Sequence, residues 1–81
     1  MPKQWDKQSA NSAYMYIANG MYLKIILGEG QDLDAVLWLK SGNAAYEIMQ
    51  WGWENIPDIE VAKDLARAAL KLWLTELAEG V

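Results

Sequence analysis

The chain has 81 residues, a formal net charge of −4, and neither cysteine nor histidine. A domain this small buries only about 60% of the surface that its unfolded chain exposes, so it is marginally stable without disulfides, metals or partners. The missing cysteines exclude disulfides and zinc–thiolate sites, and the missing histidines remove the commonest remaining ligand of transition metals. We therefore predict a single domain over residues 1–81 that holds no metal or cofactor and gains stability from another chain.

Acidic residues are concentrated in the middle of the chain. Residues 29–60 carry a net charge of −6, and the rest of the chain carries +2. Direct binding of nucleic acid needs a basic stripe, which this distribution does not supply. Asn19, Gly20 and Lys24 interrupt the best candidate for a membrane span, which needs about 18 to 20 apolar residues. We expect a cytoplasmic protein that binds neither nucleic acid nor membranes.

The uncharged segment near the N-terminus is compatible with two structures. Asn19-Gly20 between two apolar runs is a strong local signal for a β-hairpin with a two-residue turn. Regular pairing across that turn opposes Tyr16 to Leu23 and leaves neither face polar, so both faces would need cover. A helix over residues 7–27 instead gathers the few amide side chains along one side. We predict the helix and keep a hairpin over residues 13–27 as the alternative.

The middle segment carries polar residues at intervals of three and four, which is the spacing of the solvent face of a helix. Asp32 follows the Gly28-Glu29-Gly30 turn and is a suitable N-cap. We predict one helix from Asp32 to about Glu54. Because glycine costs about 1 kcal/mol inside a helix, a break at Ser41-Gly42-Asn43 is the alternative. The polar positions are Lys40, Asn43, Glu47, Gln50 and Glu54.

The last segment has the clearest helical signals. Pro57 and Asp58 form a typical helix start, and Gly80 marks the end. Leucines widen the apolar side of this helix beyond an ordinary stripe, which predicts burial on two sides. The three segments together predict an all-α fold, a small three-helix or four-helix bundle that forms oligomers. The alternative is an α+β fold with a β-hairpin at 13–27 followed by two helices.

The chain has five tryptophans and four tyrosines but no phenylalanine. Trp38 and Trp73 lie opposite the polar stripes of their predicted helices, so we predict that both belong to the core. Trp51 and Trp53 are two positions apart, which is about 200° on a helix, so one core cannot bury both. An indole beside a polar rim is typical of a binding hot spot. The predicted interaction site consists of Trp51, Trp53, Glu47, Glu54 and Tyr46.

No group of side chains predicts catalysis. Glu47 and Glu54 lie seven positions apart and are the best pair for acid–base work or a divalent cation, but a solvated helix face explains their spacing. We therefore expect a protein that is not an enzyme and that binds another protein or itself, as an oligomeric subunit, adaptor or inhibitor. An inhibitor of a host protein, encoded by a phage or mobile element, is one form of this hypothesis.

A second hypothesis is the binding of a small molecule. Tyrosines and tryptophans suit a ligand pocket between helices or subunits, and a few polar groups would fix the orientation of the ligand. The residues predicted for such a site are Tyr14, Tyr16, Tyr22 and Lys24.

Overall fold

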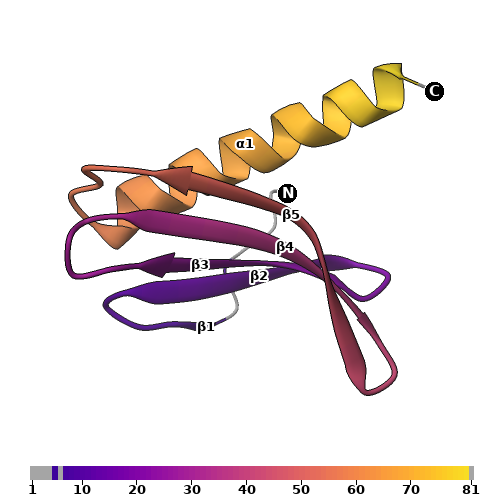
Figure 1. Cartoon of the computed structure of the whole chain (residues 1–81), viewed down its shortest axis with the longest axis horizontal. Coiled ribbons are helices and arrows are strands. Elements are labelled where there is room, and N and C mark those ends of the chain that lie inside the picture. Colours follow the sequence, from indigo (N-terminus) through magenta and orange to yellow (C-terminus); the bar gives the residue numbers. More distant parts are fainter. Residues whose placement is uncertain (1–4, 6, 81) are drawn as a thin grey trace.

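The computed structural model describes residue 5 and residues 7–80. Five strands form one antiparallel sheet in the order of the sequence, and one helix packs against one face of it (Figure 1). The predicted all-α bundle is therefore wrong, as are its helices over 7–27 and 32–54, whereas the last predicted helix is present. The elements are β1 (Lys7–Gln8), β2 (Ser12–Ala18), β3 (Met21–Leu27), β4 (Leu33–Ser41), β5 (Ala44–Trp53) and α1 (Ile59–Glu79).

The β2–β3 hairpin depends on its turn and on a bulge. Asn19 and Gly20 adopt φ angles of 56° and 85°, the left-handed conformations that a two-residue hairpin turn requires. A β-bulge at Ile17 then shifts the register by one residue, so Tyr16 pairs with Tyr22 and not with Leu23. The shift puts the tyrosines on one face and the apolar side chains on the other, which removes the objection to a hairpin in this segment.

A second bulge explains the misleading polar spacing of the middle segment. Gly42 and Asn43 form the turn between β4, which ends at Ser41, and β5, and Gly42 has a φ of 62°. The register shifts between Leu37 and Trp38, so Ile48 is the extra residue on β5. Glu47 and Gln50 therefore share one face of the sheet although they are three positions apart. A bulged strand has reproduced part of the spacing of a helix, and Asp32 precedes β4 instead of capping a helix.

The core lies between the sheet and α1. Alternate residues of β2, β3 and β4 point toward the helix, and Ala62 and Ala66 are the fully buried helix residues that face them. Their small side chains allow the helix to approach the sheet closely. Trp5 packs at the rim of the core, with the Arg67 guanidinium carbon 6.0 Å from its ring centroid. The largest fully buried side chains are Leu23, Ile25, Leu33 and Leu37.

The helix begins where the sequence predicts. The Asp58 Oδ1 atom accepts a hydrogen bond of 3.0 Å from the backbone N–H of Val61, which caps the first turn. The C-terminal half of α1 extends past the sheet (Figure 1), and Leu72 and Leu77 are exposed there. The sheet covers one side of α1, so burial on a second side is not present within the described residues of this chain. No helix in the described part of the chain has the length and apolar character needed to span a membrane.

Gly20 joins the β2–β3 turn to the end of β4. Its carbonyl oxygen accepts a hydrogen bond of 2.8 Å from the backbone N–H of Lys40. A Cβ atom at Gly20 would lie 2.6 Å from the carbonyl oxygen of Lys40, whereas a Cβ at Gly42 would meet no atom within 4 Å. Both glycines have positive φ, so the two turns differ mainly in this contact.

We expect Gly20→Ala to destabilise the protein by about 2 kcal/mol more than Gly42→Ala. Both substitutions pay the cost of a left-handed alanine, about 1 to 2 kcal/mol, but only the first also pushes the turn away from β4. Urea denaturation followed by far-UV circular dichroism measures the difference. Equal losses of stability in the two variants would show that the contact with Lys40 contributes nothing.

Candidate binding site on the open face of the sheet

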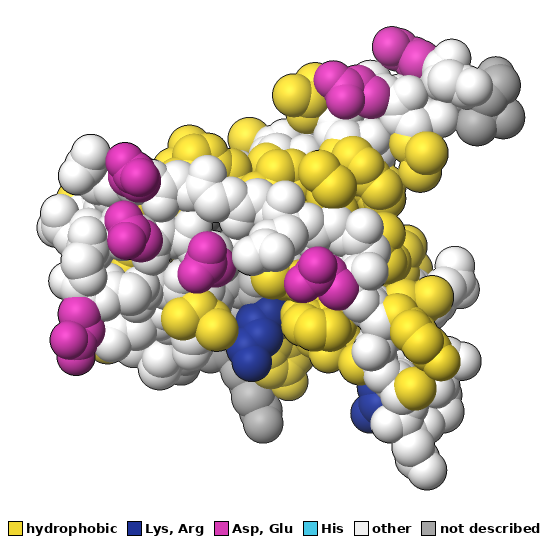
Figure 2. Space-filling view, viewed as in Figure 1, with side chains coloured by type: hydrophobic (Ala, Val, Ile, Leu, Met, Phe, Trp, Pro, Cys, Tyr) yellow, Lys and Arg dark blue, Asp and Glu magenta, His cyan; other side chains and the backbone are white. Residues whose placement is uncertain are grey.

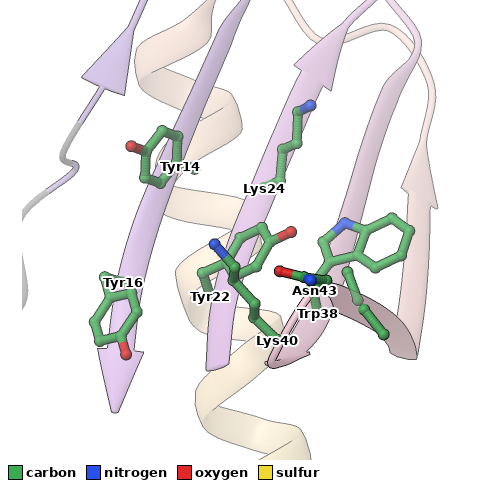
Figure 3. Close-up of a pocket in the computed structure, with 9 residues that line it drawn as sticks. Tyr14, Tyr16, Tyr22, Lys24, Trp38, Lys40 and Asn43 are labelled. Carbon is green, nitrogen blue, oxygen red and sulfur yellow. The ribbon is translucent and has the colours of Figure 1, made fainter. Parts of the chain in front are cut away.

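The face of the sheet turned away from α1 is aromatic (Figure 3). Tyr16 on β2 pairs with Tyr22 on β3, which in turn pairs with Trp38 on β4, so three rings form one row across neighbouring strands. Neighbouring strands lie about 4.8 Å apart, so the row spans about 10 Å. Tyr14 lies two residues before Tyr16 on the same face of β2. These four residues form a continuous surface that we call the aromatic face.

Contacts within the molecule fix three of these rings. The Tyr14 and Tyr22 rings meet edge to face, with centroids 6.3 Å apart and an angle of 69° between their planes. This geometry is favourable because the positive edge of one ring meets the negative face of the other. The Tyr16 hydroxyl oxygen accepts a hydrogen bond of 3.1 Å from the backbone N–H of Gly20. The turn that sets the register therefore also positions a side chain of the aromatic face.

The aromatic face forms the floor of an open depression of about 550 Å³. Its wall is the β4–β5 hairpin, whose tip curls away from the helix (Figure 1). Figure 3 shows that the side chains come from β2, β3, β4 and the hairpin turn, with α1 behind the sheet. The lining residues are Tyr14, Tyr16, Tyr22, Lys24, Trp38, Lys40, Asn43, Ala44 and Ala45.

Among the described side chains that line the depression, Lys24 and Lys40 carry the only charges. Lys24 lies two residues after Tyr22 on β3, and Lys40 lies two residues after Trp38 on β4, which runs the opposite way. The two ammonium groups therefore flank the Tyr22–Trp38 row from opposite directions along the strands. Glu47 pairs with Trp38 but does not line the depression. An anionic group is thus favoured near the lysines and disfavoured toward β5.

The four residues predicted for a ligand site all line this depression, although the expected pocket between helices was the wrong setting. Reasoning from the sequence missed Trp38, which was assigned to the core, and also Lys40 and Asn43. Trp38 and Lys40 are two positions apart, so a strand alternation would have placed them on one face. That signal was hidden by the helical spacing assigned to the same segment.

The residues predicted for a protein interaction site are not brought together. Trp51 and Trp53 pair with Ala35 and Leu33 and lie on the helix side of the sheet, because residues two apart share a face in a strand. Both are half-buried against the core, and the Trp51 ring meets Trp73 edge to face at 6.4 Å and 81°. Their structural role is packing. Of the other predicted residues, Tyr46, Glu47 and Glu54 are exposed, and Glu47 lies on the opposite face from the tryptophans.

A second depression, of about 490 Å³, lies at the other end of β4 and β5. Asp32, Asp34 and Glu54 line it together with Trp53. Within the described residues, no group of three or more Asp, Glu, His or Cys side chains is arranged to hold a metal ion.

No protein-family profile, curated protein or solved structure matches the chain. Its function has to be inferred from its surface.

We expect Trp51→Ala to lower the free energy of unfolding by about 2 to 3 kcal/mol, and Trp38→Ala to lower it by less than about 1 kcal/mol. The first substitution removes a ring packed on the core and on Trp73, and the second removes a ring of the aromatic face. Urea denaturation measures both values. Equal losses would contradict the assignment of Trp51 to packing and of Trp38 to the binding surface.

Proposed function

We propose that this protein acts by binding and not by catalysis, and that the depression on the aromatic face holds a small planar molecule carrying a negative charge. The observation that supports this proposal is the lining of the depression, to which the described part of the chain contributes four aromatic rings, two lysines and no carboxylate. Binding of this kind requires no proton transfer and no nucleophile from the chain.

The chemistry of the surface matches such a ligand in three respects. A volume of about 550 Å³ lies within the range of about 300 to 1,000 Å³ that is usual for small-molecule sites. Aromatic rings favour a planar group, and each ring contact contributes roughly 0.5 to 1.5 kcal/mol beyond the area it buries. Lys24 and Lys40 provide positive charge within a chain of net charge −4.

Pairs of probes that differ only in charge test this proposal. Flavin mononucleotide and riboflavin share one ring system, and adenosine monophosphate and adenosine share another. In calorimetric titrations we expect each phosphate-bearing probe to bind at least 5-fold more tightly than its uncharged partner. Replacing both lysines, Lys24→Gln with Lys40→Gln, should abolish that difference, whereas Tyr22→Ala should weaken binding of all four probes by about 5-fold or more.

Lys71→Gln is the matched control, because it removes one positive charge from α1, outside the depression. This variant should bind every probe as the unaltered protein does. The proposal is wrong if no probe binds at millimolar concentration, or if the double lysine variant still distinguishes charged from uncharged probes.

Association with another protein chain is a second candidate function, as the sequence predicts. The observation that favours it is the exposed apolar surface of α1, where Leu72 and Leu77 are 61% and 55% exposed. Figure 2 shows apolar side chains on the projecting part of the helix. Contiguous apolar surface exposed on a monomer often marks a site of protein association.

A further inference from the structure

The outer side of α1 carries a mostly exposed apolar stripe, in which Leu65 also packs against the margin of the core. Val61, Leu65, Ala68 and Leu72 follow one another at intervals of four, three and four, so they form one line along the helix. The buried residues Ala62, Ala66 and Leu70 lie on the other side, against the sheet. Leu72 is exposed, Val61 and Ala68 are exposed as well, and Leu65 is half-buried. We call these four residues the outer stripe.

This spacing is the one by which a helix packs against a second helix. Residues that alternate at intervals of three and four keep a narrow seam facing a partner helix, and each seam residue inserts between residues of the facing helix. The sheet of the same chain lies on the opposite side of α1 (Figure 1), so another chain has to provide the partner.

Two opposite charges beside the outer stripe lie at nearly equal distances on either side of Ala68. Asp64 lies four residues before Ala68 and Lys71 lies three residues after it, and at 100° per residue both fall on the same flank of the stripe. A two-fold axis that passes beside Ala68 relates two antiparallel copies of α1. This axis brings Asp64 of each copy to within one residue, about 1.5 Å, of the level of Lys71 of the other, and Leu65 of each copy equally close to the level of Leu72 of the other.

We propose that the outer stripe binds a second copy of this chain, as an antiparallel pair of α1 helices crossing at Ala68. The small side chain of Ala68 allows close approach at the crossing, and the two Asp64–Lys71 pairs match the partner in orientation and register. The match is self-complementary, as a two-fold interface requires. This inference rests on the second candidate function, association with a protein chain, and is independent of ligand binding at the aromatic face.

The strength of the contact follows from its size. The outer stripe spans about three helical turns, or roughly 16 Å, which is small beside a standard interface of about 800 Å² on each partner. We therefore expect a reversible dimer with a dissociation constant of roughly 1 to 100 μM.

Sedimentation equilibrium of the full chain from about 1 μM to 1 mM tests the dimer. The mass should rise with concentration from 9.2 kDa toward twice that value. Leu72→Glu should weaken association by at least about 10-fold, and Leu77→Glu is the matched control, because Leu77 is similarly exposed but lies on the side of α1 that faces the sheet. Circular dichroism spectra and melting curves confirm that both variants fold.

Charge exchange tests the orientation. Asp64→Lys and Lys71→Glu should each weaken the dimer by about 3-fold or more, because each places like charges opposite one another, and the double variant should recover the original affinity. A monomer at 1 mM overturns self-association. A dimer that is lost in Leu77→Glu and kept in Leu72→Glu overturns the outer stripe but not association. A dimer that the double variant fails to restore overturns the antiparallel register.

Discussion

The contact between Gly20 and the backbone of Lys40 is the constraint on which the remaining structure depends. Only a residue without a Cβ atom fits there, because a Cβ would lie 2.6 Å from the Lys40 carbonyl oxygen. With the turn held in this position, the bulge at Ile17 determines which residues of β2 face α1 and which face outward. A slip of one residue would exchange Met15 and Tyr16 between the two faces. The bulge at Ile17 therefore determines both which side chains of β2 join the core and which join the aromatic face.

This dependence explains which parts of the fold the sequence predicts. The start of α1 is encoded locally by Asp58 and the residues that follow it, so it could be read without knowledge of the rest of the chain. The strands are different, because bulges at Ile17 and Ile48 interrupt the alternation by which strands are normally recognised. Neither bulge residue is a glycine or has another distinctive property, and the bulges become visible only when the pairing of strands is known.

The difference between the period of a helix, about 3.6 residues, and that of a strand, about 2 residues, also determines which predicted site residues lie together. Trp51 and Trp53 would lie on opposite sides of a helix, but in strand β5 they lie on one side. One core can therefore pack against both indoles, which the helical arrangement did not allow. Tyr14, Tyr16, Tyr22 and Lys24 were grouped by their chemistry, which does not depend on the period, and the structure places all four around one depression. The amino-acid composition could therefore indicate residues of the aromatic face, but their arrangement could be known only from the pairing register of the strands.

The distribution of charge favours a small anion over a polyanion at the aromatic face. Lys24 and Lys40 lie on opposite sides of the Tyr22–Trp38 row within one depression, so each can meet an anionic group of a small ligand. A nucleic acid strand would continue past the site and meet the negative field of a chain with net charge −4, which includes Glu47 on the neighbouring strand. Fields of this kind extend about 8 Å at physiological ionic strength.

Pairing of two copies through α1 would leave both depressions open, because the helix and the aromatic face lie on opposite sides of the sheet. The dimer would then carry two separate sites, and ligand binding at one need not disturb the helix contact.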